Sequence, residues 1–353
     1  MPKNNAFIRL VWRLVTGIAV VGLCVLLLSA FSDRISPQTN RYIPFFGLFF
    51  PFILGFNVLF LVFWLFFHQW KQFFLTALVL LICGGAIHIY FPMHQRTQEV
   101  PKDCIKLLTY NVMHFSYKPK SKGQSILQYI KEQDPDIVCF QEFGGLKEAD
   151  VRKALKATPY SRFIYPHLAV FSKYPILSAK SLYIPSEYNG SMMVELDVNG
   201  RKLSLINNHL ESNKISSDER EEYYDLTKEL DTHKLESFTH SMFKRLSPAY
   251  SQRAQQINLL SELIHQDTNP YLVMCGDFND TPISYSHRVI NQDLVDAFVE
   301  SGKGMGISFN QHRFFFRIDY IFHSKNMKAY NCTVGKLKTS DHYPVWTYLQ
   351  LKD

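Results

Sequence analysis

Six short segments in the last two-thirds of the chain place polar side chains directly beside buried apolar runs. They are LLTYNVMHF at 107–115, DIVCFQEF at 136–143, LSLINNHLES at 203–212, YLVMCGDFNDTP at 271–282, RIDYIFHS at 317–324 and TSDHYPV at 339–345. Four to six apolar residues in a row predict a strand that is buried on both faces. Carboxylate, amide and imidazole groups at the ends of such strands form a polar pocket on a rigid support. We therefore expect the functional site of the protein in this pocket.

Three of these strand ends have both a functional and a structural interpretation. A carboxylate at the position of Glu142 is unfavourable unless it is paired or binds a cation, and oxygen ligation of a hard ion such as Mg²⁺ satisfies it. The alternative is that Glu142 caps a helix or lies at the surface. Taken alone, Asn111 is more typical of a turn, and His209 is more typical of a structural histidine.

The segment GDFND contains two polar residues with regular spacing. Gly276 lets the strand leave sharply, and the spacing of two residues directs Asp277 and Asn279 to the same side if the chain stays extended. The alternative is an Asx turn before Pro282. We favour the functional interpretation because the segment as a whole is the most specific of the six.

Together and in this order, the six segments resemble the endonuclease/exonuclease/phosphatase superfamily, the DNase I-like metal-dependent phosphodiesterases. The resemblance covers roughly residues 103–353. It implies a four-layer α/β sandwich, in which two mixed sheets pack together and helices lie outside. The pattern of the residues alone indicates only an α/β fold.

The resemblance implies a metal site and a catalytic pair. In the family, the glutamate that matches Glu142 is the main ligand of Mg²⁺ or Mn²⁺, and Asn111 and Asp341 lie near the metal. The family also implies that Asp319 holds the imidazole of His342, which acts as a general base or contacts the phosphate. An aspartate in that position fixes the tautomer of the histidine and stabilises its charged form.

The remaining site residues are implied to act on the phosphate. His209 and Asn279 would donate hydrogen bonds to its oxygens, and Asp277 would position the nucleophile or the leaving group. The predicted reaction is therefore metal-assisted, in-line hydrolysis of a phosphate ester. Either the pair of Asp319 and His342 or Asp277 could orient the attacking water, and the sequence leaves this open.

Several substrates and one rival class remain open. The first hypothesis is a phosphodiesterase or nuclease, and the alternative is a phospholipid phosphodiesterase that resembles neutral sphingomyelinase. The phosphodiester substrate would thus be a nucleic acid or a phospholipid head group. The rival is a catalytically inactive binding or scaffold protein on the same fold. The sequence gives no indication of a protein partner.

The first hundred residues have a different composition and form a separate predicted region, 1–100, ahead of a catalytic domain at 101–353. Three apolar stretches run over 14–31, 43–67 and 73–91. Each is close to the ~20 residues that cross a bilayer. We therefore predict three transmembrane helices and a multi-pass protein of the inner or cell membrane, which contacts lipid through residues 1–100.

Basic residues in the short flanking segments predict the orientation. With a cytoplasmic N-terminus, four basic residues lie inside and two outside, namely Lys3, Arg9, Arg13 and Lys71 inside, and Arg34 and Arg41 outside. Three spans then place the catalytic domain outside the cytoplasm. Most of the net charge of +7 belongs to the flanks of these stretches, because residues 1–100 contribute +5 (seven basic minus two acidic) and residues 101–353 only +2 (31 minus 29). The basic excess is therefore not the signature of a nucleic-acid-binding surface on the C-terminal domain.

Three further segments are assigned from their patterns. Residues 123–133 and 253–265 each carry an apolar stripe with helical spacing, and Asn199-Gly200 predicts a turn between two strands. Residues 211–250 are polar and carry the acidic run DEREE at 218–222. They are interpreted either as a solvated pair of surface helices or as a lid over the predicted site.

Overall fold

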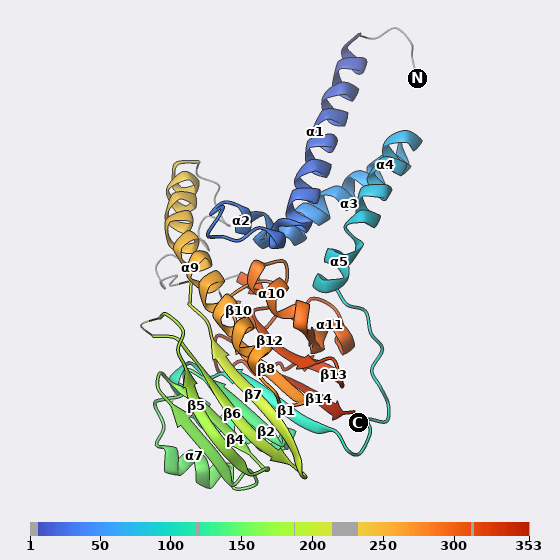
Figure 1. The fold of residues 1–353 in the computed structure, drawn as a ribbon. Helices are drawn as coiled ribbons and strands as arrows, with labels where there is room; N and C mark the ends of the chain where they lie inside the picture. The colour runs from blue at the N-terminus through green and yellow to red at the C-terminus, as the bar shows by residue number, and fades with distance from the viewer. Residues whose placement is uncertain (1–5, 117–120, 187, 214–231, 312–313, 353) are drawn as a thin grey trace.

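Two six-stranded sheets form the core of the C-terminal region (Figure 1). The computed structural model describes residues 6–116, 121–186, 188–213, 232–311 and 314–352. The first sheet has the order β13 (Met327–Val334), β14 (Val345–Leu351), β1 (Ile105–Asn111), β2 (Ile137–Gln141), β4 (Leu168–Ser172), β3 (Tyr160–Ile164). The second has the order β5 (Ile176–Leu182), β6 (Gly190–Val198), β7 (Arg201–His209), β8 (Tyr271–Asp277), β12 (Asp319–Ser324), β9 (Leu294–Asp296).

Both sheets are mixed, because one parallel pair lies at the centre of each. β1 is parallel to β2, and β7 is parallel to β8, whereas the other pairs are antiparallel. β1, β2 and β8 are buried along their whole lengths and β7 from Leu203 onward, as their apolar runs predict. A short hairpin of β10 (Phe309–Gln311) and β11 (Phe314–Phe316) stands apart from both sheets.

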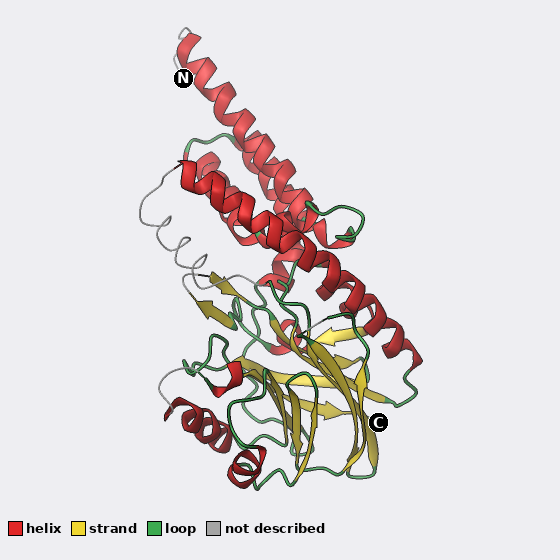
Figure 2. Cartoon of the chain, turned by 90° about the vertical axis from the view of Figure 1, so that its left-hand side faces the viewer, coloured by secondary structure: helices red, strands yellow, loops and turns green. Residues whose placement is uncertain are grey.

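Helices cover the outer faces of the two sheets, which gives the four predicted layers (Figure 2). α6 (Ser121–Gln133) and α7 (Glu148–Ala154) pack on the first sheet. α9 (Thr232–Gln266) and α10 (Tyr285–Asp293) pack on the second, and α11 (Ala297–Ser301) follows β9. The predicted α/β sandwich and both predicted helices are confirmed.

The predicted turn joins β6 to β7. Val198 pairs with Arg201, so that Asn199 and Gly200 form a two-residue hairpin loop. Their φ angles of 55° and 84° are those of the left-handed region, which asparagine and glycine tolerate best. The turn fixes the register of β7 and thereby the position of His209 at its other end.

The N-terminal region is helical but less regular than predicted. It contains α1 (Ala6–Ala30), the short turn η1 (Ser32–Arg34), α2 (Ile43–Leu48), α3 (Phe50–Phe66), α4 (Trp70–Ile82) and α5 (Gly84–Tyr90). Among the described residues, α1 is the one helix that is long and apolar enough to cross a membrane. The count rises to two if α4 and α5, which are bent by 60°, form one broken span.

The prediction of three transmembrane helices is therefore not supported. Prolines stand in the first turns of α2 and α3 and divide the second apolar stretch, which leaves α3 with 17 residues. Gly84 and Gly85 begin α5 directly after the bend that divides the third stretch. What the structure supports is one long apolar helix near the N-terminus, of the kind found in signal sequences and membrane anchors.

The segment 211–250 is only partly described. The acidic run at 218–222 lies in 214–231, outside the described residues. From Thr232 the chain forms one continuous helix, α9, and the remainder of the predicted helix pair falls outside the described residues. Met242, Leu246 and Tyr250 on this helix pack against Phe45 and Leu48 of the N-terminal region, so this part of the segment is not simply solvated.

Candidate active site

The predicted side chains meet because the central strands end at the same edge of the two sheets. Asn111 pairs with Gln141 at the ends of β1 and β2, and His209 pairs with Asp277 at the ends of β7 and β8. β12 runs the opposite way and begins there, with Asp319 opposite Asp277. Parallel strands deliver their carboxyl ends to one edge, so each apolar run carries its polar end to this place.

Gln141 connects the two sheets directly beneath this edge. Its amide nitrogen donates to Asn207 of β7 at 2.6 Å and to Thr109 of β1 at 3.0 Å. Asn207 in turn donates to the Phe140 carbonyl at 3.0 Å. All of these groups are buried, and a buried amide that bridges two sheets has a structural role.

Asn111 joins two carboxylates. Its Nδ2 donates to Oε1 of Glu142 at 3.1 Å and to Oδ2 of Asp277 at 3.0 Å. Its Oδ1 accepts the backbone N–H of Met113 at 3.1 Å. Glu142 has a φ of 51°, an unusual conformation for a residue with a side chain. Its side chain stays about 30% exposed, so it is an accessible carboxylate of the site.

His342 and Asp319 form the predicted pair. Nδ1 of His342 lies 2.8 Å from Oδ2 of Asp319, and both side chains are buried. Nε2 of His342 faces Oδ2 of Asp277 at 3.5 Å. The imidazole is thus held between two carboxylates, one on each side of the ring.

His209 and Asn279 complete the group around Asp277. Nε2 of His209 lies 3.7 Å from Oδ2 of Asp277 and 3.8 Å from Oε1 of Glu142. The backbone N–H of Asn279 donates to Oδ1 of Asp277 at 2.8 Å, and its Nδ2 donates to the Leu210 carbonyl at 3.0 Å. Asn279 also has a positive φ, 53°, and such conformations gather at functional sites.

Asp341, the last predicted residue, lies at the same edge and is only partly buried. The hydroxyl of Ser340 donates to the Asn111 carbonyl at 2.8 Å and reaches Oδ1 of Asp341 at 3.3 Å. Asp280, by contrast, pairs with Arg253 at 3.5 Å and accepts from Ser286 at 2.9 Å. All eight predicted site residues are thus brought together, whereas Asp280 is engaged by Arg253 and Ser286.

Burial and neighbouring charges shift the pKa values of the site residues in opposite directions. Burial raises the pKa of Asp277 to about 6, although the neighbouring His342 and His209 act to lower it. Burial alone would lower the pKa of His342, but the carboxylates of Asp319 and Asp277 outweigh it and raise that pKa well above its usual value. Burial disfavours the charged form of Glu142, but His209, Asn111 and His342 outweigh it and lower its pKa. A protonated His342 is suited to donate to a phosphate oxygen.

The donor set fits a divalent cation. Asp277, Asp319 and His342 each offer one ligand atom, and these atoms lie within 4.8 Å of one another. Oδ1 of Asp319 is buried and has no hydrogen-bond partner among the described residues. Carboxylate oxygens are preferred ligands of Mg²⁺ and Mn²⁺. This buried group differs from the predicted ligand set of Asn111, Glu142 and Asp341, whose assignment stays a prediction.

Sequence reasoning missed His114, which stands beside Glu142. Its Nε2 lies 4.0 Å from Oε2 of Glu142, and its ring contacts that of His167 at 4.8 Å between centroids. The residue has a φ of 54°. Gly145 is needed for this arrangement, because a Cβ there would lie 1.9 Å from the His114 carbonyl oxygen. No spacing in the sequence indicated this contact, since it depends on an irregular turn.

It also missed Arg253, which links two of the strand-end segments. Its Nη1 donates to the Glu211 carbonyl and to Oδ1 of Asn213, both at 2.8 Å. Its Nε faces Asp280 at 3.5 Å, and the side chain is fully buried. Arg253 therefore ties the segment that follows His209 to the segment that follows Asp277. In the sequence it is only the first residue of an apolar helical stripe.

Comparisons with known proteins agree with this geometry. A humanized D. rerio TDP2 carrying 14 mutations has 15% sequence identity and a TM-score of 0.51, and the match covers 70% of this chain and 100% of that one. An endonuclease/exonuclease/phosphatase from Beutenbergia cavernae has 17% identity and a TM-score of 0.51, over 70% and 72% of the two chains. One from Bacteroides vulgatus has the same identity and TM-score, over 70% and 99%.

Two family models match separate parts of the sequence. A model described as a domain of unknown function (DUF8431) matches residues 12–90. No curated protein sequence matches the chain. The model of the Endonuclease/Exonuclease/phosphatase family matches residues 108–342, about two-thirds of the sequence and all eight site residues. The chain therefore belongs to the endonuclease/exonuclease/phosphatase family.

Proposed function

We propose that this chain is a divalent-metal-dependent phosphodiesterase that is anchored in a membrane by its long apolar helix α1. The observation that carries the proposal is the convergence of eight side chains from six separate segments at one edge of the sheets. Carboxylates, amides and paired imidazoles in contact with one another suit the hydrolysis of a phosphate ester. A scaffold protein would have no need to keep all of these groups in place.

Each site residue would have a separate role in hydrolysis. Glu142 would hold the cation with Asn111 and Asp341, and the cation, when bound, would offset the charge of the phosphate. His209 and Asn279 would donate to the phosphate oxygens as charge builds on them. Asp277 or the pair of Asp319 and His342 would orient water for in-line attack. Asn111 keeps Glu142 and Asp277 in fixed relation throughout, because it is bonded to both.

The surface of the helical region supports contact with lipid. Large apolar side chains on α1, α3 and α4 are exposed, among them Ile18, Val21, Leu59 and Leu81 at 55%, 62%, 70% and 77%. An apolar groove of about 720 Å³ also lies along α1 and α3. Exposed apolar surface of this extent is unfavourable in water and typical of membrane contact. If the N-terminus is cytoplasmic, a single crossing by α1 would place the catalytic domain outside the cytoplasm.

One specific contact favours a phospholipid head group over nucleic acid as the substrate. Ile283 lies six residues after Asp277 and packs in the apolar cluster of the N-terminal helices, which includes Leu26 and Phe50. A Cβ on Gly47 would lie 2.0 Å from the Ile283 carbonyl oxygen, so the two regions meet closely. The site is therefore near the helices that would lie in the membrane, where head groups are presented.

A substrate panel tests the proposal. The full chain in detergent, with Mg²⁺ or Mn²⁺, would be assayed on single- and double-stranded DNA, RNA, sphingomyelin in mixed micelles and a chromogenic phosphodiester. We expect hydrolysis of at least one phosphodiester that stops in excess EDTA, with sphingomyelin preferred over nucleic acid. Preference for DNA or RNA would favour the nuclease alternative. Absence of hydrolysis of every substrate would favour the scaffold protein instead.

A further inference from the structure

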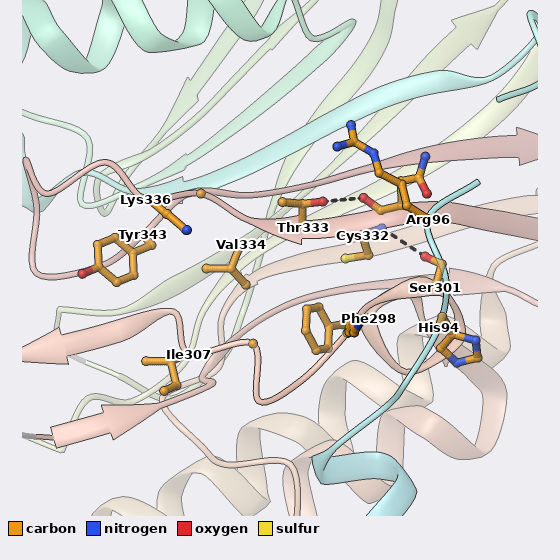
Figure 3. A pocket seen from close by; sticks show the side chains of 14 residues that line it. His94, Arg96, Phe298, Ser301, Ile307, Cys332, Thr333, Val334, Lys336 and Tyr343 are labelled. Atoms are coloured by element: carbon orange, nitrogen blue, oxygen red, sulfur yellow. Dashed lines mark hydrogen bonds between the residues drawn. The ribbon is translucent and has the colours of Figure 1, made fainter. Parts of the chain in front are cut away.

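A cavity of about 470 Å³ lies beside the connection that leads from the N-terminal helices to β1, and none of the eight candidate site residues lines it. Figure 3 shows its lining, which comes from this connection, from α11, from β13 and from the loop after β13. Four of the lining side chains are basic or can become so, namely His94, Arg96, Lys303 and Lys336. None of the residues that line it is acidic.

The positive charges of this pocket are not neutralised within the part of the chain that the structure describes. Arg96, Lys303 and Lys336 form no ion pair with a described carboxylate, and Arg96 and Lys336 are exposed. Glu300 is the acidic residue of α11, but its Oε2 is engaged by Nε2 of His323 at 3.0 Å and by the backbone N–H of Ala329. The cavity therefore keeps a positive potential.

The wall that carries Arg96 is fixed. The backbone N–H of Thr97 donates to Oδ1 of Asn331 at 2.8 Å, and Nδ2 of Asn331 donates back to the Thr97 carbonyl at 3.0 Å. On the other side, Nε2 of His94 contacts the Val299 carbonyl at 2.8 Å. The backbone is thus tied to the domain on both sides of Arg96, at His94 and at Thr97, so Arg96 lines the cavity from a fixed position.

The rest of the lining is mixed. Ser301 and Thr333 bring hydroxyl groups, and the hydroxyl of Thr333 donates to the Asn331 carbonyl at 2.7 Å. Phe298, Val334 and Ile307 bring apolar surface to the same cavity (Figure 3). The basic side chains match the charge of a phosphate, and the apolar side chains can contact the group that carries it.

We propose that this cavity is a second anion-binding site, which takes a phosphate-bearing ligand and is separate from the catalytic edge. Its position follows from His94, four residues after the end of α5. If the chain is membrane-anchored as proposed above, the phosphate of an anionic phospholipid is available at that level. A soluble phosphate has the same recognised group, and the experiment separates the two sources.

Binding would be measured by calorimetry on the full chain in detergent, at low salt and in EDTA. The probes are inorganic phosphate, the short-chain lipid dihexanoylphosphatidic acid and, as a zwitterionic control, dihexanoylphosphatidylcholine. The double variant Arg96→Ala/Lys336→Ala is compared with Lys131→Ala/Lys338→Ala, which removes two exposed positive charges outside the pocket. We expect the pocket variant to bind phosphate or phosphatidic acid at least about tenfold more weakly, because charged hydrogen bonds are lost.

The outcomes are separable. Tighter binding of phosphatidic acid than of inorganic phosphate identifies a lipid ligand, and equal affinity identifies a soluble one. The control variant should bind like wild type, and unfolding temperatures of both variants should stay unchanged because the substituted side chains lie at the surface. Affinity that is equal in the pocket variant and wild type would overturn the proposal. Because EDTA removes the cation that hydrolysis requires, the binding measurement does not depend on catalysis. The anion-binding proposal would therefore still hold if the phosphodiesterase proposal failed.

Discussion

At the scale of single residues, Oδ2 of Asp277 is the point on which the site converges. Asn111, His209 and His342 all approach this one oxygen, at 3.0, 3.7 and 3.5 Å. The group is fully buried, so its charge depends on these neighbours rather than on water. Changes at Glu142 and Asp277 should therefore both remove activity but differ in their effect on stability.

Replacing Glu142 by glutamine should remove activity and keep the fold. Glutamine has the same shape and can still accept the hydrogen bond from Asn111, but it lacks the charge that a divalent cation needs. We expect a fall in turnover by about 10² or more, the scale for losing a charge-stabilising group. Steady-state assays with and without EDTA, together with circular dichroism, would check this. Full activity of wild type in excess EDTA would contradict it.

Replacing Asp277 by asparagine should stabilise the metal-free protein above pH 6 and inactivate it. Burial raises the pKa of Asp277 from 3.8 to about 6, so the folded state favours the protonated form. The ionised carboxylate therefore opposes folding fully above about pH 6, and this effect disappears as the pH falls towards 3.8. We expect the variant to unfold at a higher temperature than wild type at pH 7.5.

Thermal unfolding in EDTA between pH 4 and pH 8 checks this prediction. The difference between Asp277→Asn and wild type should shrink steadily as the pH is lowered. His342→Ala is a useful comparison, because removal of that imidazole takes away a positive neighbour of Asp277 rather than the buried carboxylate. A variant that is less stable than wild type at every pH would show that the carboxylate is needed for folding.

Individual site residues could be predicted from the sequence when they follow a regular strand. Asn111, His209 and Asp277 end buried strands, and the order of the segments assigned roles to them. His114 could not be predicted, because it stands in a turn where Met113, His114 and Phe115 all have positive φ. No residue type in that turn requires such a conformation, so only the packed neighbours determine it.

At the scale of elements, the approach of β7 to β8 determines whether His209 and Asp277 can meet. The two strands are paired over their whole lengths, from Leu203 with Tyr271 to His209 with Asp277. Gly276 lies one residue before the end, with a φ of 131°. A Cβ there would stand 2.0 Å from the Asn208 carbonyl oxygen, so the strand ends can approach only through a glycine.

Gly276→Ala should therefore destabilise the domain and reduce activity together. The backbone strain alone is worth roughly 1–3 kcal/mol, and the contact with β7 adds to it. Gly200→Ala is the matched control, because Gly200 also has a positive φ, 84°, but a Cβ there meets nothing within 4 Å. Urea unfolding and turnover should show a loss in both for the first variant and a smaller loss of stability alone for the second. Equal effects would contradict the role given to the strand contact.

Elements could be predicted where apolar spacing is regular, and less well where the chain is apolar throughout. α6 and the C-terminal half of α9 follow their stripes, but residues 43–67 are apolar on all sides and carry no period. In such a stretch the hydropathy is uniform, whereas Pro44 and Pro51 determine where α2 and α3 begin. Counting apolar residues therefore overestimated the number of spans.

At the scale of the whole molecule, the two regions are joined by polar contacts as well as apolar ones. Asp33 of η1 faces Arg288 of α10 at 3.8 Å, and Arg317, which is fully buried, donates to the Ile89 carbonyl of α5. Phe243 of α9 stacks on Phe45 of α2, with ring centroids 5.2 Å apart. Because these contacts include buried charged groups, the fold fixes the position of the site edge relative to the N-terminal helices.

Charged substitutions in α1 should determine whether this helix is the anchor. Ile18 and Val21 are more than half exposed on α1, and each lysine placed at the centre of a membrane helix opposes insertion by about 2.5–3.5 kcal/mol. We expect Ile18→Lys/Val21→Lys to move the chain from the carbonate-washed membrane pellet to the soluble or aggregated fraction. Leu177→Lys/Tyr183→Lys exposes the same two charges on the catalytic domain, at side chains that are 50% and 87% exposed, and should stay in the pellet. The mass of the pelleted wild-type chain separates an anchor from a signal sequence: an intact chain of 41.2 kDa supports the anchor, and a chain that has lost α1 contradicts it.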